Sequence, residues 1–211
     1  MTGVQTCALP IYALRVTHHP VVAVYGSARI GTDDPRFVSA RALGGALAQA
    51  GLTVATGGYQ GVMAAISRGA HDAGGEVIGY TVSSWDGLPA NEWVTRKVDS
   101  VDLFERLRLF SKADLMIALD GGIGTLTEVA VSWNLLQVGS SAQPLLMVGD
   151  EWVELVDFVA RRLVVSSQDL DLVRTLPSGT GPNAIVAEAR ALIGRRLGLG
   201  GPWESARPAL R

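Results

Sequence analysis

The sequence predicts an α/β fold in which helices cover both faces of a single, doubly wound, mostly parallel sheet. Two observations predict it: short apolar runs alternate with helix-like stretches along the chain, and these runs end at Gly, Thr or Asp. Strands that are apolar without interruption are typical of parallel sheets, because helices bury both of their faces. With 211 residues, the chain is long enough for one domain with a core of its own.

Five short runs of β-branched or aliphatic residues are predicted to be buried strands. They are Val21–Tyr25, Leu52–Ala55, Glu76–Tyr80, Leu115–Leu119 and Pro144–Val148.

Helices are predicted between these strands, where apolar residues recur every three or four positions. In the first helix these residues are Phe37, Ala40, Leu43 and Leu47, and Gly51 follows as a stop. The other predicted helices are Ala64–Ala73, Val101–Lys112, Thr125–Val138, Trp152–Leu163 and Asn183–Gly194.

Two regions depart from the alternation. Val82–Val98 is a long irregular connection that contains Trp85, and we expect it to form the lid or rim of a site. From Arg195 the chain turns to Gly, Pro and Arg without periodicity, which predicts a flexible tail over residues 195–211. Residues 20–194 are then expected to form one domain.

The start of the chain looks foreign to the protein. Thr2–Ile11 resembles the translation of a common sequencing-library adapter, so residues 1–19 are expected to be an artefact followed by a disordered lead-in. This segment contains Cys7, the only cysteine. A chain otherwise without cysteine fits a reducing cytoplasm, which is the expected compartment.

The charge balance disfavours polyanions and membranes as partners. The chain has 18 Lys and Arg against 20 Asp and Glu, a net charge of -2, so any anion site must be local. No apolar run approaches the roughly 18 residues of a membrane span. Its three histidines show no metal-ligand spacing with acidic residues or Cys. We therefore expect no nucleic acid, membrane, metal or cofactor.

Glycine occurs 25 times and is concentrated in loops after three of the predicted strands, at Gly26–Gly31, Thr56–Met63 and Asp120–Glu128. Parallel strands end at one edge of the sheet, so these loops are expected to share a crevice. Exposed backbone N–H groups and helix N-termini there would bind a phosphate. The candidate binding residues are Gly26, Ser27, Gly57, Gly58, Gly61, Gly121, Gly122, Gly124 and Thr125.

Better-known nucleotide motifs do not fit these loops. The first loop reads G-x-x-x-x-G instead of G-x-G-x-x-G, and the second strand ends at Thr56 and Gly57 instead of an acidic residue. No Lys-Ser or Lys-Thr follows the glycines. The pattern therefore disfavours NAD and ATP sites, and glycines that merely permit tight turns remain an alternative.

Glu128 is the only charged residue between Gly121 and Gly149, on a helix that is apolar nearly all round. Such a helix is expected to lie between the sheet and a second subunit, where a carboxylate needs a partner. Glu128 is either that buried carboxylate or the last residue of a capping box with Thr125. The candidate partner is Arg106, at the border of the apolar stripe of its own helix. A surface salt bridge is the alternative role for Arg106.

Two motifs in these loops resemble those of the LOG (LONELY GUY) family. Residues 57–63 match G-G-x-x-G-[LV]-M, and residues 120–128 read D-G-G-I-G-T-L-T-E where the family has P-G-G-x-G-T-x-x-E. The similarity extends over residues 21–192. It implies a Rossmann-like homodimer that hydrolyses the N-glycosidic bond of a purine-type nucleoside 5'-monophosphate to free base and ribose 5-phosphate. By this resemblance Gly121, Gly122, Gly124 and Thr125 hold the phosphate. Glu128 is then catalytic, and Arg106 corresponds to the arginine of an Arg-Lys pair.

The chain departs from the family pattern at two positions. Leu107 replaces the lysine of the Arg-Lys pair, and Asp120 replaces the leading proline. At about 7 Å and an effective dielectric of about 20, a carboxylate repels each phosphate charge by about 2 kcal/mol. A non-hydrolytic nucleotide or cofactor carrier is therefore the alternative function. Tyr59 is expected in the core or stacked on a base, and Arg29 and Glu92 are further rim candidates.

Overall fold

The structure, a computed structural model, describes residues 19–85 and 87–204. The adapter-like segment Thr2–Ile11 lies outside the described residues. Every described helix is too short or too polar to cross a membrane.

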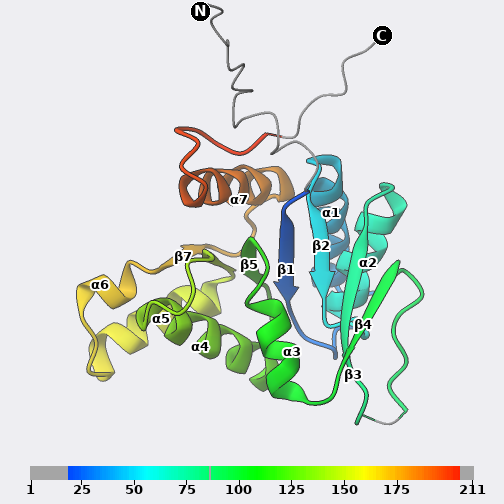
Figure 1. Cartoon of the computed structure of the whole chain (residues 1–211), viewed down its shortest axis with the longest axis horizontal. Helices are drawn as coiled ribbons and strands as arrows, with labels where there is room; N and C mark the ends of the chain where they lie inside the picture. The colour runs from blue at the N-terminus through cyan, green and yellow to red at the C-terminus, as the bar shows by residue number, and fades with distance from the viewer. Residues whose placement is uncertain (1–18, 86, 205–211) are drawn as a thin grey trace, which may run out of the picture.

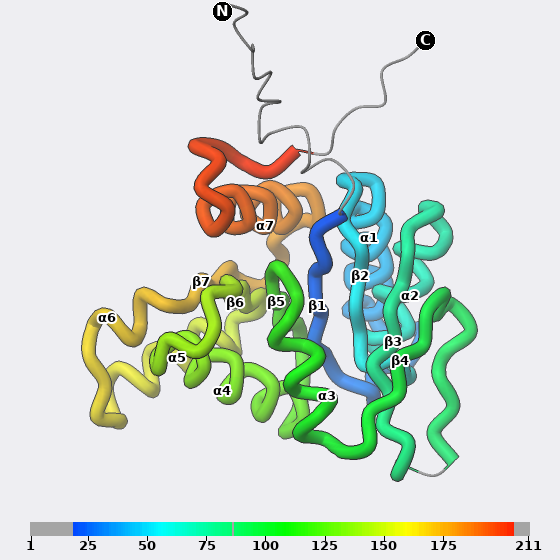
Figure 2. Tube along the Cα trace, viewed as in Figure 1, coloured from blue at the N-terminus to red at the C-terminus, as the bar shows by residue number. Residues whose placement is uncertain are grey.

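The described strands form one sheet with the order β4-β3-β2-β1-β5-β6-β7, and every neighbouring pair is parallel (Figure 1). The strands are β1 (Val21–Tyr25), β2 (Thr53–Thr56), β3 (Val77–Val82), β4 (Arg96–Ser100), β5 (Leu115–Ala118), β6 (Leu145–Val148) and β7 (Val173–Leu176). The five predicted strands are confirmed, with ends that differ by at most two residues. The chain leaves β1 toward β2 on one side and returns to β5 on the other, so the direction of winding reverses between β1 and β5 (Figure 2).

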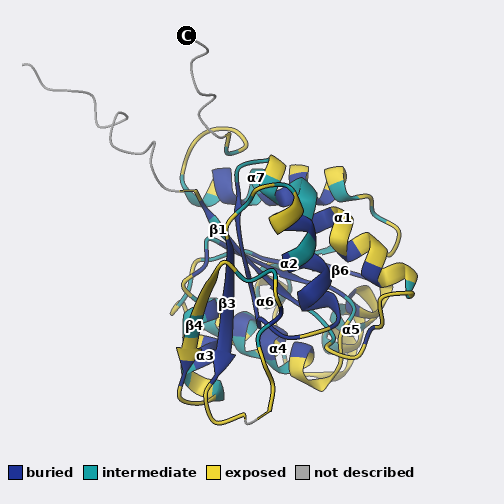
Figure 3. Cartoon of the chain, turned by 90° about the vertical axis from the view of Figure 1, so that its right-hand side faces the viewer, coloured by how far each residue is buried: buried dark blue, intermediate teal, exposed yellow. Residues whose placement is uncertain are grey.

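The two edge strands, β4 and β7, were not predicted. β4 reads Arg-Lys-Val-Asp-Ser and is mostly exposed, whereas the neighbouring β3 is buried throughout (Figure 3). A strand at the edge of a sheet pairs on one side only and does not need an apolar sequence. The apolar pattern that predicts central strands is therefore absent from both edges.

Helices cover both faces of the sheet, as predicted. One face carries α1 (Pro35–Gln49), α2 (Val62–Asp72) and α7 (Pro182–Arg196), and the other carries α3 (Leu103–Phe110), α4 (Ile123–Gln137) and α5 (Asp150–Arg162). A short α6 (Ser167–Leu170), not predicted, follows α5. Alternation along β1 shows the two layers, because Val22 and Val24 join the α1–α2–α7 core while Ala23 and Tyr25 join the other.

Helices α1 and α2 pack through glycine at very short range. A Cβ added to Gly44 of α1 would lie 2.2 Å from the carbonyl oxygen of Ile66 in α2, whereas one added to Gly45 would meet only ordinary contacts from 3.4 Å. The backbones of the two helices therefore touch at Gly44.

This packing predicts opposite outcomes for two neighbouring substitutions. Gly44→Ala should lower the free energy of unfolding by about 1–3 kcal/mol, because the helices must separate. Gly45→Ala should leave it unchanged or raise it by about 0.5–1 kcal/mol, because alanine favours a helix interior. Urea unfolding of both variants measures the difference. Equal values for the two variants would contradict the close contact at Gly44.

The end of the described chain folds back over α7. Trp203 N–H donates to the carbonyl oxygen of Arg190 at 2.9 Å, Arg190 Nε donates to the carbonyl oxygen of Trp203 at 2.6 Å, and the indole packs against the α1–α2–α7 core. Residues 195–204 of the predicted flexible tail thus contact α7, because one tryptophan gives this Gly-rich segment an apolar anchor. Residues 205–211 lie outside the described part.

Candidate active site

The three glycine loops lie side by side at the carboxyl ends of β1, β2 and β5. Ser27 N–H, after β1, donates to the carbonyl oxygen of Asp120, after β5, at 2.9 Å. The carbonyl oxygen of Ser27 in turn accepts from Val62 N–H, at the start of α2, at 2.8 Å. Gly61 has a φ of 70°, and a Cβ there would lie 2.2 Å from the Ser27 carbonyl oxygen. The first loop therefore joins the other two, and Gly61 leaves room for this.

The loop after β5 leaves the N-terminus of α4 open. Gly122 is the N-cap residue, no side chain caps the helix, and residues 121–124 are exposed. A Cβ on Gly122 or Gly124 would meet nothing within 4 Å, whereas one on Gly121 would lie 2.2 Å from Oγ1 of the buried Thr125. The first N–H groups of a helix have no intrahelical acceptor, so this end suits an anion.

Gly57 and Gly58 form the inner wall of the site. A Cβ on Gly57 would lie 1.9 Å from Nη2 of Arg106, so only glycine leaves room for the guanidinium. Gly58 N–H donates to Thr56 Oγ1 at 3.0 Å, and its carbonyl oxygen accepts from Nδ2 of the buried Asn91, also at 3.0 Å. The Gly58 amide, a predicted phosphate ligand, is therefore engaged within the protein.

Arg106 of α3 and Glu128 of α4 meet beneath this wall. Arg106 Nη1 lies 3.6 Å from Glu128 Oε1, and the two residues are only 6% and 7% exposed. Arg106 Nε also donates to the carbonyl oxygen of Tyr80 in β3 at 2.8 Å. The ion pair is buried, so the alternative of a surface salt bridge for Arg106 is wrong.

The capping-box alternative for Glu128 is also wrong. Helix α4 begins after Gly122, so Thr125 is already the third residue of the helix and not its N-cap. The Thr-x-x-Glu spacing is present three residues too late in the helix to form a capping box. Glu128 instead points to Arg106, as a buried carboxylate with a cationic partner.

Three aromatic rings surround the Arg106 guanidinium, whose Cζ lies 5.2 Å from the centroid of Phe110, 5.4 Å from Trp85 and 5.7 Å from Tyr59. The Tyr59 hydroxyl accepts from Val82 N–H at 2.9 Å, so this ring is part of the buried wall. Trp85 lies on the long connection that the sequence marks as a lid or rim. The sequence gives no sign that its indole lies over Arg106, because the two residues are on different elements.

Burial raises the pKa of Glu128 to about 7, while the positive charge of Arg106 acts to lower it. A carboxyl group with a pKa near 7 is present in both protonation states around neutral pH. This is the condition under which a side chain serves best in general acid–base catalysis. The pair is therefore suited to hold or move a proton.

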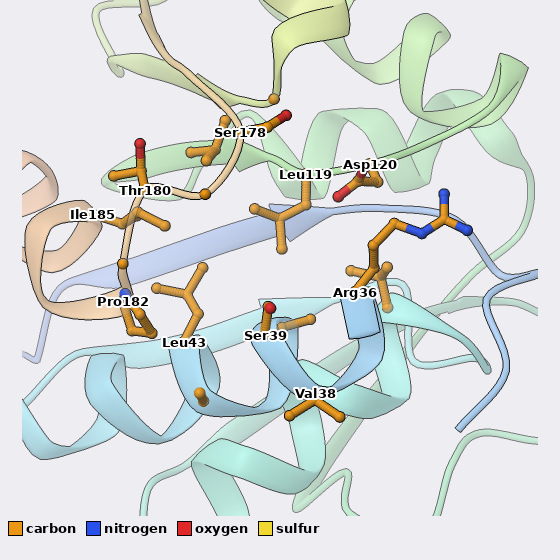
Figure 4. Close-up of a pocket in the computed structure, with 17 residues that line it drawn as sticks. Arg36, Val38, Ser39, Leu43, Leu119, Asp120, Ser178, Thr180, Pro182 and Ile185 are labelled. Atoms are coloured by element: carbon orange, nitrogen blue, oxygen red, sulfur yellow. The ribbon is translucent and has the colours of Figure 1, made fainter. Parts of the chain in front are cut away.

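A separate cavity of about 640 Å³ lies on the other face of the sheet, between α1 and α7 (Figure 4). Arg36 and Asp120 lie together at one end, with Ser178 and Thr180 further along. The Asp120 side chain therefore lies beside a cation and on the α1 side of the sheet, opposite α3 and α4.

The remaining rim candidates, Arg29 and Glu92, are exposed. Among residues 19–85 and 87–204, no group of three or more His, Cys, Asp or Glu side chains is placed to hold a metal ion.

The chain is similar to curated proteins and to solved structures. It is 30% identical over 135 residues to the cytokinin riboside 5'-monophosphate phosphoribohydrolase of Rhodococcoides fascians, covering 61% of this chain and 67% of that protein. It is 31% identical over 107 residues to a protein of the same activity name, LOG5 of Arabidopsis thaliana, covering 49% of this chain and 47% of that one.

Among solved structures, the fold is similar to a molybdenum cofactor binding protein from Rippkaea orientalis, with a TM-score of 0.67 and 22% identity over 84% of this chain and 99% of that one. A molybdenum cofactor carrier protein from Chlamydomonas reinhardtii has a TM-score of 0.63 at 23% identity, with the same coverage. These structures confirm the Rossmann-like α/β fold.

A family model, described as the SLOG cluster4 family, matches residues 19–138. This segment is more than half of the chain, and it contains the three glycine loops together with Arg106 and Glu128. The chain therefore belongs to the LOG-like SLOG cluster4 family.

Proposed function

We propose that the protein hydrolyses the N-glycosidic bond of a purine-type nucleoside 5'-monophosphate, releasing free base and ribose 5-phosphate. The observation that carries this proposal is the buried Arg106–Glu128 pair, next to the glycine loop at the open N-terminus of α4. The relatives named phosphoribohydrolases support it.

The chemistry divides between the loop and the pair. The N–H groups at the start of α4, with Gly122 and Gly124 beside them, bind the 5'-phosphate and place the ribose. As the bond from C1' to the base breaks, C1' gains oxocarbenium character, which the ionised Glu128 stabilises. Glu128 also takes the proton of the attacking water and passes it on to the departing base, which is released in its neutral form. Arg106, fixed by the Tyr80 carbonyl, orients the carboxylate and favours its ionised form.

The test is release of base by the full chain. Purified protein is incubated with AMP, GMP and CMP, and with adenosine as a control without phosphate, and the products are separated by chromatography. We expect adenine or guanine together with ribose 5-phosphate from the purine monophosphates, and no reaction with adenosine. Monophosphates that remain intact would contradict the proposal.

The second candidate is a carrier that binds a nucleotide or cofactor without hydrolysis. Leu107 favours it, because the buried leucine lacks the second positive charge of the family's Arg-Lys pair. Asp120 is a weaker argument, since its side chain lies beside Arg36 at the α1–α7 cavity. A carrier would bind AMP tightly in the same assay and return it unchanged.

The proposed assembly is a cytoplasmic homodimer that covers the outer side of α4. Apolar side chains are exposed along this helix, with Ile123 at 79%, Val138 at 59% and Leu126 at 38%. A groove of about 250 Å³ continues this apolar surface between α4 and α5. A second copy of the chain offers a matching apolar surface, as two-fold interfaces require. A sedimentation-velocity mass of one chain would contradict the dimer.

A further inference from the structure

The catalytic pair is covered. Arg106 is 6% exposed and Glu128 is 7% exposed, yet the proposed hydrolysis requires a ribose and a water molecule to reach the carboxylate. A group that lies over the pair must therefore move when a ligand binds.

Trp85 is the most exposed of the three rings around Arg106. Phe110 is 1% exposed and packs edge-on against Tyr25 and Tyr80, with centroid distances of 5.1 Å. Tyr59 is held by the hydrogen bond from Val82 N–H. Trp85 is 37% exposed, and its indole N–H donates no hydrogen bond to any described residue. Its ring contacts with described residues are those with Tyr59, at a centroid distance of 5.8 Å, and with Arg106.

We propose that Trp85 exchanges Arg106 for the ligand: its indole turns off the guanidinium and stacks on the planar heterocycle of a purine nucleoside monophosphate. Arg106 keeps the rings of Phe110 and Tyr59 when the indole leaves, so the cation–π contact that is lost is weaker than the stacking that the indole gains on a base. The movement uncovers Arg106, the cation that orients the carboxylate. The inference rests on the binding half of the proposed function and does not depend on hydrolysis.

Trp85 then recognises the base while the α4 loop recognises the phosphate, and a binding experiment separates the two. Dissociation constants of AMP and of ribose 5-phosphate, which has no base, are measured by calorimetry. All proteins in this experiment carry Glu128→Gln to prevent turnover, and residue 85 is Trp, Phe or Ala. Trp85→Ala should raise the dissociation constant of AMP about tenfold or more, as expected when a stacking ring is removed. The dissociation constant of ribose 5-phosphate should change by less than about twofold. Trp85→Phe should recover most of the AMP affinity.

The chain offers a matched control in Trp93, which lies on the same connection and over another arginine, Arg68, at 5.4 Å. Trp93→Ala should leave both dissociation constants unchanged. Tryptophan fluorescence provides a second readout: AMP should change the emission of the wild type and of Trp93→Phe, but not of Trp85→Phe.

The results separate this inference from the proposed hydrolysis. If the wild type releases no base but Trp85→Ala still weakens the binding of AMP and not that of ribose 5-phosphate, the proposed hydrolysis is wrong and the role of Trp85 stands. If base is released but Trp85→Ala changes neither the dissociation constant nor the KM for AMP, the role of Trp85 is overturned. An equal loss of AMP and ribose 5-phosphate would also overturn it, because Trp85 would then only support the fold of the site.

Discussion

Glu128→Gln is expected to lower the rate of base release by at least about 100-fold, the effect typical of removing a general acid or base. The amide has nearly the same shape, but it can neither stabilise positive charge at C1' nor accept the proton of water. Binding of AMP should persist, because the phosphate is held by the loop at α4. Steady-state kinetics and calorimetry on the same preparation measure both effects.

The pH profile is a second readout of Glu128. Since burial raises its pKa to about 7, and the ionised carboxylate is the active form, the rate should rise with pH through about 7. The matched control is Glu154→Gln, an exposed carboxylate of α5, which should keep both the rate and the profile. A Glu128→Gln variant with an unchanged rate would show that the carboxylate is structural.

Arg106→Gln is expected to lower the free energy of unfolding by about 3 kcal/mol at pH 8, because it leaves the buried Glu128 carboxylate without its cation. The guanidinium also occupies the space beside Gly57 and hydrogen bonds to the Tyr80 carbonyl. Arg108→Gln is the control, since Arg108 is exposed on the same helix. Arg108→Gln should lower the free energy of unfolding by less than about 0.5 kcal/mol. Urea unfolding measures both variants.

The loss should depend on pH in a defined direction. The pKa of Glu128 lies at about 7 in the folded protein against an ordinary value of 4.5, so its contribution to stability is complete below 4.5 and is lost as pH rises through 7. Without Arg106 this pKa rises further, so at pH 5 the carboxyl group stays neutral and the variant should be closer to wild type. A loss at pH 5 as large as that at pH 8 would contradict the charge argument.

The central strands and their helices were predictable because their sequences carry the signal of their surroundings. Val22 and Val24 face one core and Ala23 and Tyr25 face the other, so β1 is apolar along its whole length. The edge strand β4 faces solvent with Lys97 and Asp99, which form an ion pair at 3.0 Å. Such a sequence is indistinguishable from a polar loop until the neighbouring strand is known.

Arg106 and Glu128 were also identified as candidates from the sequence, through the lone charge in an apolar helix and the motif around it. The sequence left two interpretations of Glu128 open, because Thr-x-x-Glu fits both a capping box and a catalytic motif. The choice depended on where α4 begins, and this is set by the position of Gly122 after β5. Similarly, composition suggests a free tail after Arg195, whereas Trp203 reaches back to Arg190.

Local patterns of residues were thus sufficient for the order of the buried elements, the three glycine loops and a carboxylate in need of a partner, because burial and turn geometry constrain residue types over a few positions. Contacts between distant segments required the folded chain. Trp85 over Arg106, Arg106 against Gly57 and the cavity between α1 and α7 join segments that no short pattern relates. Packing between elements depends on the positions of whole helices and strands, and only the assembled sheet sets these positions.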